Sequence, residues 1–212
     1  MRITKNADVR KNEILDIAQT LFNEKGYTQT TIDDILKESG IAKGTLYYHF
    51  KNKEDILLAM IDRQIEQREQ AISQIAEDDM FSAVEKLVQV IQLLSRNEMM
   101  ADSVYEPGNA KLHHESFTRS LMRFTPIMTE IVKQGIRSRE FSTPYPQESV
   151  ELLFCASELH DPRMFAWSEE ERQQKKTAFF WMLELTLGIS SDANKRLYQL
   201  AGLSQEVLKN NG

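Results

Sequence analysis

The sequence predicts an all-α protein with a small N-terminal head and a larger helical body. Its 212 residues include only eight glycines and five prolines, and 41% are hydrophobic. Apolar residues recur at the three- and four-residue spacing of amphipathic helices. Several of these segments begin with a capping residue, of which Thr31, Asn52 and Ser168 are the clearest.

The first predicted helix covers residues 7–25. Ile14, Ala18, Leu21 and Phe22 fall on one face of it, and Gly26 provides its stop. We expect this helix to brace the two that follow, which gives a three-helix head.

Residues 30–53 predict two short helices joined by a tight turn. Thr31 and Asp34 have the spacing of a capping box at the start of the first helix. Gly40 can adopt the left-handed conformation that a sharp helix exit needs. A second helix follows from about Ala42, so the segment predicts a helix-turn-helix.

The second short helix is expected to bury Leu46 and Phe50, which are four residues apart, and to leave a polar and aromatic surface outside. Lysine can donate to guanine or phosphate, and small residues let a helix N-terminus approach base edges. Tyrosines and a histidine on a surface are often only solvated residues, but here they follow a capped helix and a turn. The predicted DNA-binding residues are Thr31, Lys43, Gly44, Thr45, Tyr47, Tyr48, His49 and Lys53.

Residues 43–54, KGTLYYHFKNKE, resemble the signature of the tetracycline-repressor (TetR) family of bacterial regulators. The resemblance runs from about Ile14 to Leu57 and is architectural beyond that. It implies a homodimer that binds an operator and a C-terminal body that binds a small-molecule effector. Ala42 departs from the family pattern, in which a serine or threonine often caps this helix. The missing cap costs about 0.5–2 kcal/mol.

The next helix is predicted from residue 53 to residue 77, with Asn52 as its cap. At about 1.5 Å per residue it reaches roughly 40 Å, which is too long for the head alone. We therefore expect it to connect the head to the body. The predicted domains are residues 1–52 for DNA binding and residues 53–212 for effector binding and dimerisation.

The remaining sequence predicts a body made of helices. Pro126 should kink the longest of them, because proline lacks the backbone donor. The predicted segments are residues 80–96, a short stretch at 97–106, 110–139, 147–159, 168–188 and one or two short helices within 192–209.

Two of these segments, residues 150–159 and 178–189, carry apolar residues on more than one face. A helix that is apolar nearly all round must be covered on both sides. Either it is buried within a monomer, or one side meets a partner, and the family resemblance implies a second copy. The residues predicted for this interface are Val150, Leu153, Phe154, Phe180, Leu183 and Leu187.

The body is also expected to hold an effector pocket with an apolar lining and a few polar contacts. Nine methionines suggest an adaptable lining, although any single methionine is more often ordinary core. The predicted pocket residues are Met60, Gln64, Met100, His113, Phe117, Met122, Glu158 and Trp181.

Composition and motif content narrow the possible locations and functions of the protein. The net charge is −6, but residues 1–55 hold nine Lys/Arg and nine Asp/Glu, so the acidity belongs to the body. Cys155 is the single cysteine, which fits a reducing cytoplasm. No signal peptide or membrane span is evident. We expect no cofactor, no metal site and no enzymatic activity, because no phosphate-binding loop, metal-spaced cluster or nucleophile motif is present.

The function hypothesis is a homodimeric transcriptional regulator, a repressor released from a palindromic operator by a small effector. The main alternative is a protein of the same fold controlled by a protein partner and acting in chromosome organisation. A body packed too tightly to hold a cavity would favour that alternative.

Overall fold

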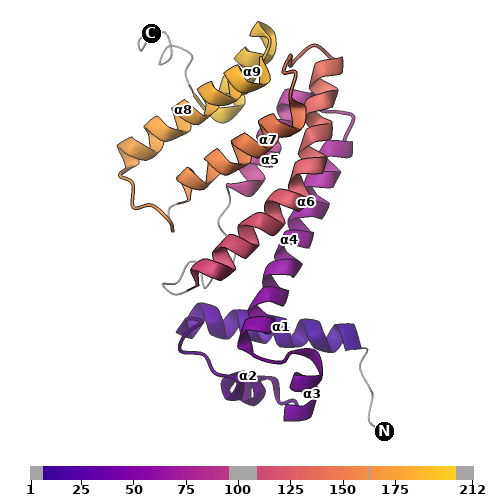
Figure 1. Cartoon of the computed structure of the whole chain (residues 1–212), viewed down its shortest axis with the longest axis vertical. Helices are drawn as coiled ribbons and strands as arrows, with labels where there is room; N and C mark the ends of the chain where they lie inside the picture. The colour runs from indigo at the N-terminus through magenta and orange to yellow at the C-terminus, as the bar shows by residue number, and fades with distance from the viewer. Residues whose placement is uncertain (1–6, 96–108, 162, 204–212) are drawn as a thin grey trace. The chain divides into compact units, whose positions relative to one another are not determined.

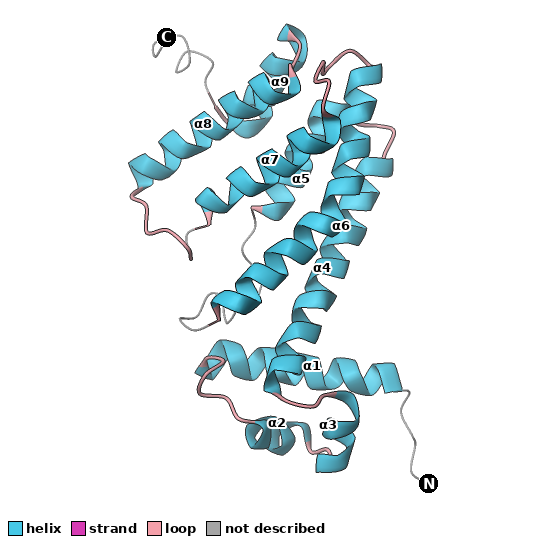
Figure 2. Cartoon of the chain, in the orientation of Figure 1, coloured by secondary structure: helices cyan, strands magenta, loops and turns pink. Residues whose placement is uncertain are grey.

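The computed structural model describes residues 7–95, 109–161 and 163–203, and within these ranges all regular secondary structure is helical (Figures 1 and 2). The all-α prediction is confirmed. The predicted helix at 97–106 and the predicted pocket residue Met100 lie outside the described ranges. The helices are α1 (Ala7–Lys25), α2 (Ile32–Ser39), α3 (Lys43–His49), α4 (Lys53–Glu77), α5 (Ala83–Leu94), α6 (Ala110–Arg137), α7 (Pro146–Ser157), the 3₁₀ turn η3 (Glu158–His160), α8 (Glu169–Leu187) and α9 (Ser191–Ala201).

The chain forms two compact units. The head unit comprises residues 1–66 and 98–117, and the body unit comprises residues 67–97 and 118–212. Helices α4 and α6 therefore contribute residues to both units. The boundary expected between residues 52 and 53 stays a prediction.

The core of the head unit is built from the apolar faces that the sequence predicts. Helix α1 buries Ile14, Leu15, Ala18, Leu21 and Phe22. Each large aliphatic side chain removed from water in this way contributes about 1.5–3 kcal/mol. Ile35 of α2 and Leu46 of α3 are completely buried, so both short helices are held by their inner faces.

The first half of α4 is also attached to α1. The Arg63 guanidinium donates to the Asp16 carboxylate at 2.7 Å, and Gln64 Nε2 donates to Gln19 Oε1 at 3.0 Å. The ion pair contributes little by itself, because the Asp16 side chain is largely exposed. Together with the buried apolar contacts, these bonds hold this part of α4 against α1 within the head unit.

In the body unit, α5 begins at Ala83, later than the predicted start at residue 80, because Ser82 caps it. Ser82 and Glu85 form a capping box. The Glu140 carboxylate also accepts hydrogen bonds from the backbone N–H groups of Ala83 and Val84, at 3.3 and 3.0 Å. A negative charge at a helix N-terminus is stabilising. Glu140, in the loop that follows α6, therefore stabilises the start of α5.

Lys86 of α5 is a buried lysine, with only 1% of its surface exposed. Its ammonium donates to the Ala76 carbonyl at 2.8 Å and to Gln134 Oε1 at 2.9 Å. Ala76 lies in the last turn of α4, where a helix carries unpaired carbonyls and favours a cation. Lys86 therefore joins the C-terminal end of α4 to α5 and α6.

The end of α6 leaves no room for a side chain at Gly135. The N–H groups of Glu140 and Phe141 both donate to the Gly135 carbonyl, which closes the helix end. A Cβ at residue 135 would lie 2.1 Å from the Phe141 ring, and Phe141 is itself buried. Helix α6 continues through Pro126. The proline has no N–H group to donate to the Met122 carbonyl one turn earlier, and Met122 is exposed.

Candidate nucleic-acid interface

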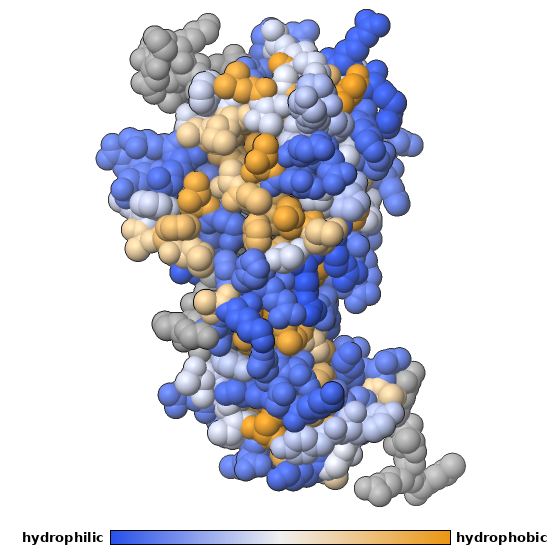
Figure 3. All heavy atoms as spheres, viewed as in Figure 1, coloured by the Kyte–Doolittle hydropathy of each residue, from blue (hydrophilic) through white to orange (hydrophobic). Residues whose placement is uncertain are grey.

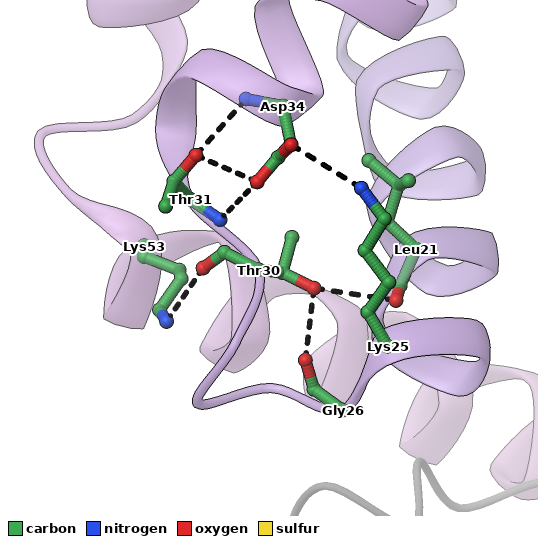
Figure 4. A network of polar contacts seen from close by, with 7 residues as sticks. All are labelled: Leu21, Lys25, Gly26, Thr30, Thr31, Asp34 and Lys53. Carbon is green, nitrogen blue, oxygen red and sulfur yellow. Dashed lines mark hydrogen bonds and ion pairs between the residues drawn. The ribbon is translucent and has the colours of Figure 1, made fainter.

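The entrance to α2 is fixed by the predicted capping box. Asp34 N–H donates to Thr31 Oγ1 at 3.1 Å, and the Asp34 carboxylate accepts from Thr31 N–H at 2.9 Å and from Thr31 Oγ1 at 2.7 Å (Figure 4). Lys25 adds an ion pair to Asp34 at 3.2 Å. In these contacts the Thr31 hydroxyl donates its proton and accepts one hydrogen bond. In its predicted role in DNA binding it would therefore act as an acceptor, through its second lone pair.

The capping box makes the stability of α2 depend on pH in the acid range. The hydrogen bonds from the Thr31 side chain and backbone, together with Lys25, lower the pKa of the Asp34 carboxyl from 3.8 to about 2. A depressed pKa means that the stabilisation is present above pH 3.8 and is lost as the pH falls through the folded-state value.

We therefore expect Asp34→Asn to lower the thermal midpoint near neutral pH, because asparagine carries no charge for the helix N-terminus. The difference between the wild type and the variant should shrink as the pH falls from 3.8 to about 2. Thermal melts of both proteins across this range test it. Asp33→Asn, on the same turn but outside the capping box, is the control, and an equal pH dependence in both variants would contradict the assignment.

The turn and α3 also follow the sequence prediction. Gly40 has the left-handed φ of 62° and closes α2, and Ala42 precedes α3 without a side-chain cap. Leu46 is fully buried and Phe50 nearly so. These two anchors decide which face of α3 points outward.

The outward face of α3 carries the predicted DNA-contacting residues. Lys43, Gly44, Tyr47 and Tyr48 are exposed, with 44% of Tyr47 and 76% of Tyr48 accessible, and Thr45 and His49 are partly exposed. The Lys43 ammonium lies 5.9 Å from the centre of the Tyr47 ring, and the His49 and Tyr48 rings pack edge to face at 4.9 Å. The face thus combines a cation, two phenols and an imidazole.

Gly44 is not required by the packing of the chain itself. A Cβ built at this position meets no atom within 4 Å, whereas glycine inside a helix costs about 0.5–1 kcal/mol relative to alanine. An open surface where a glycine stands suits the close approach of another molecule to the first turn of α3.

Lys53 is placed differently from the other predicted DNA-binding residues. Its ammonium donates to the backbone carbonyls of Tyr27 at 2.6 Å and Thr28 at 3.4 Å, and to that of Thr30 at 2.7 Å, the last of which Figure 4 shows. It also lies 4.3 Å from the centre of the Tyr27 ring. Sequence reasoning missed this role, because the acceptors belong to a turn more than twenty residues earlier in the chain.

The residues predicted for an effector pocket are divided between the two units. Met60 is buried in the head unit, and His113 and Phe117 are partly exposed there. In the body unit, Met122 and Trp181 are exposed. Glu158 is partly buried, and this burial, with the neighbouring Asp161 carboxylate, raises the pKa of its carboxyl. The pocket stays a prediction.

The residues predicted for a dimer interface mostly face the chain's own core. Val150, Leu153, Phe180, Leu183 and Leu187 are buried within the single chain, and Phe154 is partly buried. Their burial within one chain does not test the dimer interface, which stays a prediction. The sequence pattern could not choose between the two apolar sides of α7 and α8.

The opposite sides of α7 and α8 are apolar and exposed. On α8, Trp181, Met182 and Leu185 lie on one stripe, and on α7 Leu152 is 67% exposed. Figure 3 shows apolar residues gathered on the face of the body unit where these two helices lie. Exposed apolar patches of this kind mark interaction surfaces.

Within the described residues, no group of three or more His, Cys, Asp or Glu side chains is arranged to hold a metal ion. The helices in the described part of the chain include none with the length and apolar character to cross a bilayer.

Two family models match the chain. One, described as bacterial regulatory proteins of the tetR family, covers residues 14–60, and the other, described as a tetracyclin repressor-like C-terminal domain, covers residues 92–182. The first includes all of α2 and α3, and the second covers much of the body unit.

Curated relatives agree with these matches. The fatty acid metabolism regulator protein of Bacillus subtilis is 33% identical over 137 residues, which are 60% of this chain and 69% of that protein. The biofilm operon icaADBC HTH-type negative transcriptional regulator IcaR of Staphylococcus epidermidis is 59% identical over 46 residues. That match spans 22% of this chain and only a quarter of the relative.

A solved structure supports the fold. A transcriptional regulator of the TetR/AcrR family from Thermobifida fusca superposes with a TM-score of 0.63 at 24% identity, covering 84% of this chain and 97% of that one. With this coverage the likeness of fold extends into the body.

Proposed function

Because the chain belongs to the TetR family of bacterial regulatory proteins, we propose that it is a repressor that binds a palindromic operator as a homodimer and is released by a small-molecule effector. The observation that carries this proposal is the outward face of α3. Lys43, Tyr47 and Tyr48 are exposed on a helix whose opposite side is fixed by a buried leucine.

The chemistry of this face suits the major groove. A helix fits that groove, lysine can donate to guanine O6 and N7, and a phenol can donate to base edges or to phosphate. The net charge of −6 does not oppose this role, because phosphate binding depends on the local cations. Lys43 and Lys51 are both exposed near α3.

The test is a selection from duplexes randomised over about 30 base pairs, a length that holds two half-sites roughly one helical turn apart. The wild-type protein should enrich an inverted repeat whose half-sites have that spacing. Enrichment of no sequence, with no binding even at low salt, would overturn the proposal.

Dimerisation is proposed through the exposed stripes of α7 and α8. Two copies would cover Leu152, Trp181, Met182 and Leu185 and remove this apolar surface from water. A pair of chains also supplies the two α3 helices that successive major grooves require.

Leu185→Asp should convert the dimer into a monomer at micromolar concentration, because a carboxylate in the middle of an apolar interface would have to be desolvated. Sedimentation equilibrium measures the change. Leu200→Asp, at an exposed leucine of α9 outside the stripe, is the matched control and should stay dimeric. If Leu185→Asp and Leu200→Asp had the same distribution of molecular mass, this surface would not be the dimer interface.

Release by an effector is proposed on thermodynamic grounds and on one feature of α6. An effector that favours a head spacing unable to span both half-sites must weaken DNA binding, and a coupling of about 1–3 kcal/mol is enough for a switch. Thr125 and Thr129, one turn apart on α6, are buried in the body unit, and their hydroxyls have no hydrogen-bond partner there among the described residues. Buried hydroxyls of this kind are suited to a ligand with polar groups.

A further inference from the structure

The ammonium of Lys53 is surrounded by backbone carbonyls. Three of them, from Tyr27, Thr28 and Thr30, accept its N–H groups, two at 2.7 Å or less. A lysine ammonium has three donors, so it can serve all three carbonyls at once. The Tyr27 ring adds a cation–π contact at 4.3 Å.

The segment that Lys53 holds determines where α2 begins. Thr30 is completely buried, and its hydroxyl donates to the carbonyls of Gly26 at 2.8 Å and Leu21 at 3.2 Å (Figure 4). Thr31, the next residue, caps α2. The turn between α1 and α2 is therefore fixed from one side by the end of α1 and from the other by the first residue of α4.

Helix α3 lies in the chain between these two fixed points. Its predecessor α2 starts at the turn that Lys53 holds. Helix α4, which begins with Lys53, follows α3 after the three intervening residues 50–52. A seven-residue helix has little surface with which to fix its own direction. The bonds of Lys53 join residue 53 to residues 27–30, so α2 and α3 lie in a segment whose two ends are held together.

We propose that Lys53 is a positioning residue, which holds the α1–α2 turn against the start of α4 and so sets the direction of α3 for sequence recognition, rather than a phosphate contact. The inference rests on the proposed DNA-binding function and specifies how its site is held. Arginine cannot replace lysine here, because three carbonyls converge on one point, whereas a guanidinium is a wide planar fork.

The experiment compares Lys53→Met and Lys53→Arg with Lys51→Met, which removes the same charge from an exposed lysine two residues away. Affinity is measured for the duplex that the wild type selects and for an unrelated duplex, over a range of salt concentrations. Both Lys53 variants should lose about tenfold or more in affinity for the selected duplex. Their affinity for the unrelated duplex and their salt dependence should match those of the wild type, whereas Lys51→Met should bind both duplexes more weakly to the same extent.

A phosphate contact would give a different result. Lys53→Arg would then keep its affinity, and Lys53→Met would bind both duplexes more weakly with a shallower salt dependence, by about 0.9 in the logarithmic slope. Either outcome would overturn the inference.

Hydrogen exchange of the free protein separates this inference from the proposed function. In Lys53→Met, exchange at residues 26–31 should accelerate by about tenfold or more while α8 is unchanged. Unchanged exchange at residues 26–31 would refute the positioning role, whatever the DNA result. A wild type that binds no DNA would refute the proposed function and, with it, the recognition role of Lys53.

Discussion

Tyr47→Ala is expected to lower the affinity for a selected operator about ten- to hundredfold, which corresponds to the roughly 1–3 kcal/mol of a specific base contact. The fold should be unaffected, because the phenol is 44% exposed and Leu46 and Phe50 hold the helix from inside. Fluorescence anisotropy with a labelled duplex measures the affinity, and circular dichroism checks the fold.

The control for Tyr47→Ala is Met80→Ala, which removes an exposed apolar side chain from the α4–α5 loop of the body unit. Its operator affinity should equal that of the wild type. Lys43→Ala should weaken binding as well. If Tyr47→Ala and Lys43→Ala both bind the operator normally, the outward face of α3 is not the surface that contacts DNA.

Gly135→Ala is expected to lower the free energy of unfolding by about 1–3 kcal/mol, the range found for overpacked cores. Alanine normally stabilises a helix relative to glycine. Here its Cβ would lie 2.1 Å from the buried Phe141 ring, and the ring must move or the end of α6 must open. Urea unfolding measures the loss.

Gly44→Ala is the matched control for Gly135→Ala. Both glycines lie within helices, but nothing lies within 4 Å of a Cβ at residue 44. This variant should therefore gain about 0.5–1 kcal/mol from helix propensity. Destabilisation by both substitutions to the same extent would show that the contact with Phe141 is not responsible.

The helix-turn-helix could be predicted from the sequence because its signals are local. Thr31 and Asp34 form the predicted box, Gly40 has the left-handed conformation, and Leu46 is the inner anchor of α3. Each of these features depends on residues within a few positions, so the pattern alone determines it.

The candidate contacts of the body could not be predicted in the same way. Helix α8 is apolar on both sides, so its spacing gave no reason to place Leu183 inside and Leu185 outside, as the structure does. The position of Lys53 depends equally on distant residues, since its acceptors lie in the turn after α1. Only the folded chain brings such groups together.

The burial of Lys86 makes it a chemical reporter of the body unit. Amine-reactive reagents will modify exposed lysines such as Lys43 within seconds to minutes, whereas an ammonium with 1% exposure is protected until α4, α5 and α6 separate at their junction. The rate at which Lys86 becomes acylated therefore measures the opening of that junction. The same chemistry advises against immobilising the protein through its amines, because it would also modify Lys43 on the proposed DNA-contacting face of α3.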